Sequence, residues 1–119
     1  MKSFLRIAIA LTLLFVTNIS AANAENPRTR IRNLSHSTVT VTMFCKRPAD
    51  DYNYSCEYFR VDAGQEYTAR EPYVWIILIK MYSSDRAVVC QATEYPLMHE
   101  GSPGQSWEIH GPPCKLVRV

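Results

Sequence analysis

The sequence predicts an all-β protein, a small disulfide-stapled antiparallel β-sandwich of about seven or eight strands. Three observations predict it. Short apolar and β-branched segments alternate in and out with a period of two residues. Clusters of Gly, Pro, Asp and Ser separate them at regular spacing, and four cysteines follow a segment typical of a secretory signal. No segment favours a helix over a strand.

The N-terminus has the layout of a signal peptide. Basic residues precede an apolar run over residues 7–16, and a small-x-small cleavage site ends at Ala24. An uncleaved anchor helix is the alternative, but the run is shorter than the ~20 apolar residues that cross a bilayer. We therefore expect residues 1–24 to be removed and 25–119 to form a single β-sandwich domain without membrane insertion.

Loss of Lys2 and Arg6 reduces the 13 basic residues to 11, which balance the 11 acidic residues. This balance gives no electrostatic argument for nucleic acid or an anionic membrane as the partner. Arg28, Arg30 and Arg32 lie on one side of an extended segment. They favour a solvated edge strand, with an anionic partner surface as the alternative.

The strands follow in order along the chain. Residues 28–34 are expected to form a lead-in strand or an extended arm. Residues 38–45 (TVTVTMFC) alternate strictly, with Val39, Val41, Met43 and Cys45 on one face. A polar loop at 46–55, with Pro48 and two adjacent aspartates, leads to a strand at 55–61. The turn at 62–65 contains Gly64, so 66–70 is expected to return as the second strand of a hairpin.

The second half of the chain predicts four more strands. Residues 73–82 (YVWIILIKMY) are β-branched and aromatic, which favours a central strand over a buried helix. A strand at 87–93 precedes the longest loop, at 94–105. The last strands cover 106–110 and 114–119.

An even number of cysteines behind a secretory signal indicates two disulfides among Cys45, Cys56, Cys90 and Cys114. We favour Cys45–Cys90 with Cys56–Cys114, because Cys45 and Cys90 lie in predicted strands that could join the two sheets. Spacing does not fix the connectivity, and Cys45–Cys56, which would close the acidic loop, remains an alternative. A zinc site is not expected, because there is no CxxC pair and no paired histidines.

Residues that could carry catalysis are few. His36, His99 and His110 lie in or beside predicted loops and strand ends, without a nucleophile elbow. Asp50 and Asp51 are adjacent in an extended loop and point apart, which favours a turn over a paired-carboxylate or calcium site. We expect no enzyme activity, no cofactor and no metal.

The aromatic residues divide into two groups. Tyr52 and Tyr54 lie in a predicted loop, where a core role is hard to supply, and are candidate partner contacts. Trp75 and Trp107 lie in predicted strands among apolar neighbours and are expected in the core.

Two sequons, Asn33-Leu34-Ser35 and Asn53-Tyr54-Ser55, mark possible N-glycosylation sites on surface loops. These asparagines can carry N-glycans only if the producing cell is eukaryotic.

Several segments resemble the plant self-incompatibility S-protein homologues. They are residues 30–34, the strand ending in Cys45-Lys46 ahead of Asp50-Asp51, the turn at 63–67, and the stretch 107–114 (WEIHGPPC). The cysteine that this family carries shortly before the late Trp is absent, and Cys56 makes up the count. The resemblance implies a small secreted β-sandwich that acts as an extracellular ligand for a cell-surface receptor.

The sequence thus favours a secreted, non-enzymatic recognition protein, an extracellular ligand or binding module with loops on a rigid sandwich. The partner would be a protein or glycan outside the cytoplasm, bound by a monomer through the 46–55 and 94–105 loops. One alternative is a bacterial periplasmic or exported inhibitor or binding protein. Another is a small secreted hydrolase that uses His99 or His110.

Overall fold

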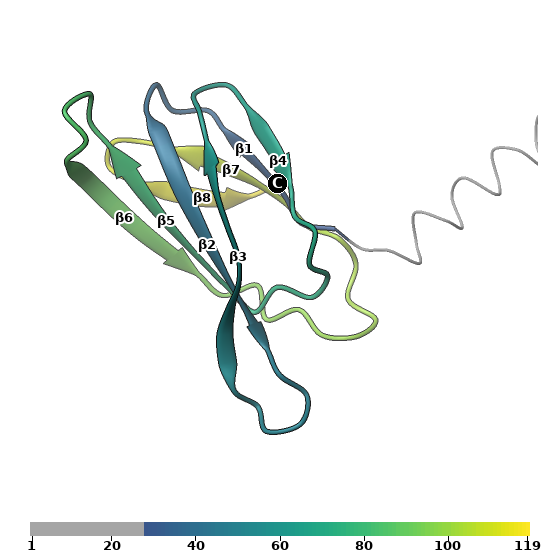
Figure 1. Ribbon diagram of the computed structural model, residues 1–119. Helices are drawn as coiled ribbons and strands as arrows, with labels where there is room; N and C mark the ends of the chain where they lie inside the picture. Colours follow the sequence, from purple (N-terminus) through teal and green to yellow (C-terminus); the bar gives the residue numbers. More distant parts are fainter. Residues whose placement is uncertain (1–27) are drawn as a thin grey trace, which may run out of the picture.

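The computed structural model describes residues 28–119, which form two four-stranded sheets packed as a sandwich (Figure 1). The strands are β1 (Arg30–Asn33), β2 (Thr38–Lys46), β3 (Asn53–Val61), β4 (Glu66–Thr68), β5 (Ile76–Tyr82), β6 (Val88–Glu94), β7 (Ser106–His110) and β8 (Lys115–Arg118). The predicted all-β sandwich is confirmed, and each predicted strand segment overlaps one of these strands. The predicted signal peptide, residues 1–24, lies outside the described residues.

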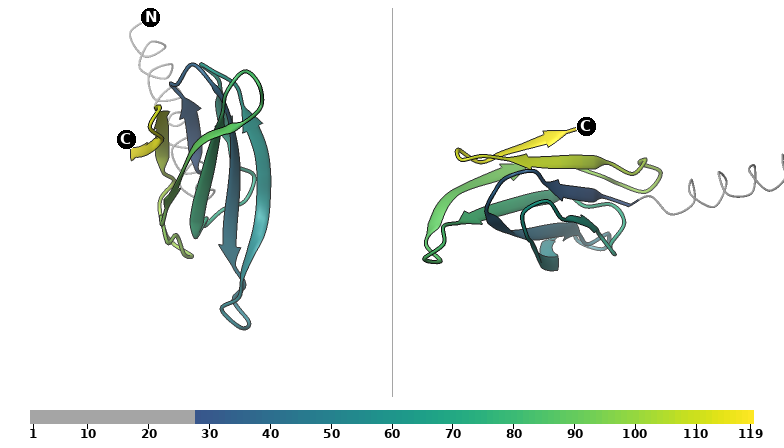
Figure 2. Two further views of the ribbon diagram at one scale, coloured as in Figure 1. Left: turned by 90° about the vertical axis from the view of Figure 1, so that its left-hand side faces the viewer. Right: turned by 90° about the horizontal axis from the view of Figure 1, so that it is seen from above.

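One sheet has the strand order β3-β2-β5-β6 and is antiparallel throughout. The other has the order β4-β1-β7-β8, and its β1–β7 pair is parallel. Parallel neighbours need a long crossover, and here the whole first sheet lies between β1 and β7 in the sequence. Figure 2 shows the two layers edge-on. Among the described strands, this pair is the one exception to the predicted antiparallel arrangement.

Strand β1 is interior, between β4 and β7, so the prediction of an arginine-bearing edge strand is wrong. The alternation itself is as expected, because Arg30 and Arg32 are exposed on the outer face. Arg32 lies opposite Glu66 on β4 and Glu108 on β7. Acidic neighbours on both sides offset its charge in the middle of the sheet.

Strand β2 confirms the strict alternation read from its sequence, since Val39, Val41 and Met43 are fully buried. Its neighbours are β3 and β5, and β5 is a central strand as predicted. The core lies between the sheets and consists of Ile31, Val39, Val41, Met43, Phe59, Val61, Ala69, Val74, Ile77, Ile79, Met81, Met98, Trp107, Ile109 and Leu116.

Strand β4 does not form a hairpin with β3; it crosses to the other sheet and pairs with β1. The turn at 62–65 forms as predicted, with Gly64 at φ 78°. This turn is bonded to β1, because the amide of Gly64 donates to the carbonyl of Asn33 and the amide of Asn33 donates to the carbonyl of Gln65. These bonds direct the chain away from β3. A turn whose sequence is typical of a hairpin therefore connects the two sheets.

The disulfides are Cys45–Cys56 and Cys90–Cys114, so the preferred pairing of Cys45 with Cys90 is wrong. Cys45 and Cys90 lie in the same sheet, on β2 and β6, with β5 between them. Cys90 is also aligned through β5 with Val39, which lies about 20 Å along β2 from Cys45. We call Cys45–Cys56 the hairpin disulfide and Cys90–Cys114, which connects β6 to the chain just before β8, the inter-sheet disulfide.

The β2–β3 hairpin projects from the sandwich (Figures 1 and 2). Strand β2 pairs with β5 only as far as Phe44, whereas it continues to pair with β3 as far as Lys46. The register shifts beside Phe44, which leaves Cys56 as an extra residue on β3. The hairpin disulfide joins the two strands at this point, so the projecting hairpin, residues 45–54, has a cross-linked base.

Candidate functional site

Three loops that are far apart in the sequence meet at one end of the sandwich, which we call the hairpin end. They are residues 47–52, 69–75 and 95–105, and each connects strands whose neighbouring ends lie there. The sequence singled out the first and third of these loops as binding elements. The structure brings both to the same end of the molecule and adds the middle loop between them.

A depression of about 410 Å³ lies between the three loops. It is lined by Lys46, Pro48, Asp51, Tyr73, Trp75, Met98, His99 and Glu100. Its volume is within the range of sites that hold small ligands or single side chains.

Main-chain hydrogen bonds hold the walls of the depression. The amide of Trp75 donates to the carbonyl of Phe44 at 2.8 Å, which fixes the middle loop to β2. The amides of Leu97 and Met98 donate to the carbonyls of Trp75 and Val74, which fixes the long loop to the middle loop. The walls are therefore a continuation of the sheet and not free loops.

The backbone around the depression adopts an unusual conformation. Non-glycine residues with positive φ are Asp51 (58°), Tyr73 (58°), Leu97 (49°) and Arg86 (66°), and the first three lie in or beside the lining. An aromatic or branched residue in this region is uncommon and costs free energy. Such residues concentrate at binding and active sites, where the surrounding structure enforces them.

Trp75 is half-buried before the start of β5, so its predicted core position is wrong, whereas Trp107 is buried as predicted. The ammonium of Lys46 lies 4.3 Å from the centroid of the Trp75 ring. The same ammonium is 3.9 Å from the carboxylate of Asp51. A cation–π contact and an ion pair thus occupy one wall of the depression.

The tip of the projecting hairpin is ordered by charge and stacking. The guanidinium of Arg47 donates to both carboxylate oxygens of Asp50 and lies over the ring of Tyr52, 5.2 Å from its centroid. The hydrogen bond from Arg47 holds the pKa of Asp50 below its usual value. Asp50 therefore belongs to a turn, as the sequence indicated.

Both tyrosines predicted as partner contacts are exposed on the projecting hairpin. Tyr52 is 59% exposed in the loop, and Tyr54 is 42% exposed on β3 opposite Cys45. The predicted loop at 46–55 is shorter than expected, because the hairpin strands extend to Lys46 and from Asn53. Tyr54 therefore projects from a strand with a fixed direction.

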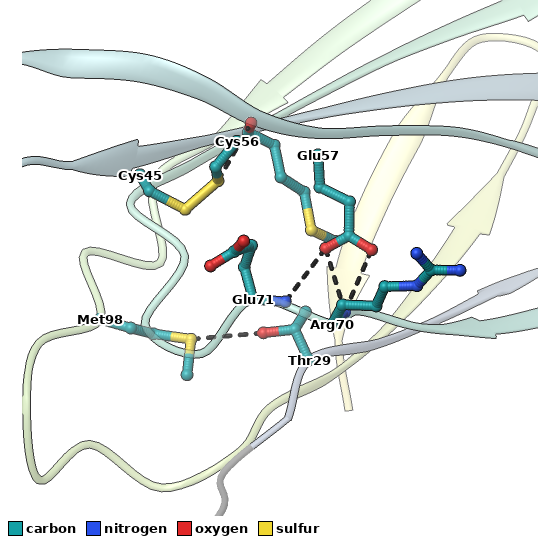
Figure 3. The surroundings of a disulfide bond; sticks show 8 residues. Thr29, Cys45, Cys56, Glu57, Arg70, Glu71 and Met98 are labelled. Carbon is teal, nitrogen blue, oxygen red and sulfur yellow. Dashed lines mark hydrogen bonds between the residues drawn. A yellow bond between two sulfur atoms is a disulfide. The ribbon is translucent and has the colours of Figure 1, made fainter.

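Glu57 anchors the middle loop, a role that no pattern in the sequence indicates. Its carboxylate accepts hydrogen bonds from the amides of Arg70 and Glu71 beside the hairpin disulfide (Figure 3), and from the hydroxyl of Tyr67 at 2.8 Å. The Glu57 hydrogen bond, together with burial, raises the pKa of Tyr67. The ring of Tyr67 stacks on Phe59, with centroids 3.7 Å apart.

The two sequons differ in accessibility. Asn53 is exposed at the start of β3. Asn33 is fully buried, and its amide nitrogen donates to the carbonyls of Ser37 and Val61. The expectation that both lie on surface loops is wrong for Asn33, because a glycan on this nitrogen does not fit the fold.

The histidines are dispersed. His99 lies at the hairpin end, with Nδ1 2.9 Å from the carbonyl of Glu100, and His110 lies at the opposite end, with Nε2 3.4 Å from Glu108. His36 is exposed in the turn after β1. Within residues 28–119 no histidine ring is hydrogen-bonded to a serine hydroxyl, and no group of three potential metal ligands occurs.

Comparison with family models, with curated proteins and with solved structures gives no match. In the part of the chain that the structure describes, no helix is long and apolar enough to cross a membrane.

Proposed function

We propose that this chain is a secreted, non-enzymatic recognition protein that binds a protein or glycan partner through the hairpin end of the sandwich. The observation that carries this proposal is the meeting of the 47–52 and 95–105 loops around one depression, beside a projecting hairpin with exposed tyrosines. Tyrosine provides a large contact area at a small entropic cost and is enriched among residues that dominate binding.

Rigidity of the site supports the same proposal. The hairpin is cross-linked at its base, and the middle loop is anchored by Glu57. A surface ordered before binding loses less conformational entropy when its partner binds.

The disulfides and the N-terminal sequence support an extracellular location, or a periplasmic one in a bacterium. Disulfides persist in oxidising compartments, where small domains use them to supplement a modest core. The resemblance to the plant self-incompatibility S-protein homologues belongs to this proposal, since it implies an extracellular ligand.

The test is binding of the labelled mature protein to the surface of cells from its source organism. Double substitution Tyr52→Ala with Tyr54→Ala should weaken binding by at least about tenfold, the loss of one dominant contact. Tyr58→Ala is the matched control, because Tyr58 is 66% exposed on β3 but lies in the body of the sandwich. Unchanged binding of the double variant, with an unchanged melting temperature, would refute the assignment of the site.

The projecting hairpin also favours a second candidate, an exported inhibitor that inserts the hairpin tip into a hydrolase cleft. A narrow, cross-linked projection can enter such a cleft, whereas a flat surface cannot. Inhibition of secreted hydrolases that is lost with the tyrosine double variant would support it. A hydrolase that uses His99 or His110 has less support, because within residues 28–119 neither ring is hydrogen-bonded to a serine or aspartate side chain.

A further inference from the structure

The depression at the hairpin end holds a cation against an aromatic wall. The ammonium of Lys46 lies 4.3 Å from the centre of the Trp75 ring. Attraction between a cation and the face of an indole is weak at an exposed site and stronger when water is excluded. The ring thus already accepts a positively charged group on one side of the depression.

The lining carries more negative than positive charge. Asp51 and Glu100 contribute two carboxylates, whereas Lys46 is the only lysine or arginine in the lining. Arg47 is nearby but is engaged by Asp50. A ligand with one positive charge would bring the net charge of the depression to zero.

The contact between Lys46 and Trp75 is held loosely. The only ion pair of Lys46 in the described chain is with Asp51, at 3.9 Å, and the side chain of Asp51 is 81% exposed. Exposed ion pairs of this kind contribute little to stability. An incoming cation can therefore displace the lysine, whose flexible stem reaches solvent without a change in the backbone.

From these observations we propose that the depression binds a lysine or arginine side chain presented by a partner protein. In the free protein Lys46 occupies the place of that side chain on Trp75. The proposal rests on the proposed function, since it names the chemistry of the partner for the same site. A neutral glycan fits less well, because it would replace a cation on the ring and leave the carboxylates of Asp51 and Glu100 without a positive charge in its place.

The indole NH signals in the NMR spectrum provide a direct test. The chain has two tryptophans, and Trp107 serves as the internal control because its indole is 7% exposed and donates to Gln105. Titration of the labelled mature protein with N-acetyl-arginine amide or N-acetyl-lysine amide should shift the Trp75 signal and leave the Trp107 signal in place. N-acetyl-leucine amide should have no effect.

Lys46→Met should increase the affinity for both basic amides by about two- to fivefold, because it removes the competing cation and keeps the length of the side chain. Lys115→Met, at the opposite end of the sandwich, is the matched control and should leave the affinity unchanged. Trp75→Leu should abolish the shifts of the backbone amides around the depression. Lys46→Met keeps the test decisive if Trp75→Leu does not fold.

Two results would overturn the inference. One is a Trp75 signal that does not respond to either basic amide, in the wild type and in Lys46→Met. The other is a response to methyl glycosides and not to the amides, which would identify a glycan site and leave the proposed function intact. A response to the amides, combined with cell binding that the tyrosine variants do not affect, would instead refute the assigned role of Tyr52 and Tyr54 and leave cation binding in the depression standing.

Discussion

Replacement of Asn33 by alanine tests whether a sequon asparagine is a structural element of the core. Its side chain takes part in four hydrogen bonds: it donates to the carbonyls of Ser37 (2.8 Å) and Val61 (2.9 Å), and accepts from the amide (3.0 Å) and hydroxyl (2.6 Å) of Ser35. Because the site is fully buried, no water replaces these partners. The side chain therefore fixes the turn after β1 to the end of β3.

The expected magnitude follows from this count. A net contribution of about 1 kcal/mol for each hydrogen bond gives a loss of about 4 kcal/mol in the free energy of unfolding. The carbonyl of Val61 would also be left without this donor in a buried position. For a domain whose total stability is about 5–15 kcal/mol, such a loss is large.

Urea unfolding monitored by tryptophan fluorescence measures the effect. With a slope of about 1–2 kcal/mol per M, the midpoint of Asn33→Ala should fall by about 2–4 M. Asn53→Ala is the matched control, since it removes the same side chain from an exposed position and should change stability by less than about 0.5 kcal/mol. A loss below about 1 kcal/mol for Asn33→Ala would refute the hydrogen-bonded arrangement.

The remaining predictions concern the disulfides and the pH dependence of stability. Paired Cys→Ser changes should cost about 3 kcal/mol at the hairpin disulfide and about 3.5 kcal/mol at the inter-sheet disulfide, whose cysteines are 24 and not 11 residues apart. Urea unfolding measures both, and the reverse order would contradict the loop-closure argument. Because the hydrogen bond to Glu57 raises the pKa of Tyr67 in the folded state, its contribution is complete below pH ~10 and is lost as pH rises through the folded pKa. Melting temperatures between pH 9 and 12 should therefore fall more steeply for the wild type than for Tyr67→Phe, and parallel curves would contradict this assignment.

Local patterns in the sequence predicted the strands well. Alternation over residues 38–45 placed Val39, Val41 and Met43 in the core, because the period of two has a direct geometric meaning in a strand. The burial of Asn33 could also be predicted from the sequence, because Asn33 lies two residues after Ile31 in the same strand and so points to the same inner face. The sequon suggested a surface position instead, although a sequon by itself carries no information on whether its asparagine is buried.

Features that depend on the relation between distant segments could not be predicted in this way. A turn containing Gly64 fits a hairpin and a crossover equally well, and its bonds to β1 decide between them. The disulfide pairing depends on strand order, which sets Cys45 and Cys90 apart within one sheet. Similarly, the role of Trp75 depends on where β5 begins, and a continuous apolar run does not mark that boundary.

The contrast between the two ends of the sandwich connects the fold to the proposed site. At the opposite end, short turns at 34–37, 62–65, 83–87 and 111–114 join the strands, and the 62–65 turn is bonded to β1. At the hairpin end the loops are longer, and three non-glycine residues hold a backbone conformation that costs about 1 kcal/mol or more each, whereas one, Arg86, does so at the opposite end. Hydrogen bonds between the middle loop, the long loop and β2 hold the segments that contain Tyr73 and Leu97, and the amide of Asp51 donates to the carbonyl of Arg47 within the hairpin. Because these bonds shape the walls of the depression without filling it, the free energy spent on strain at this end is consistent with a surface formed for binding and not for stability.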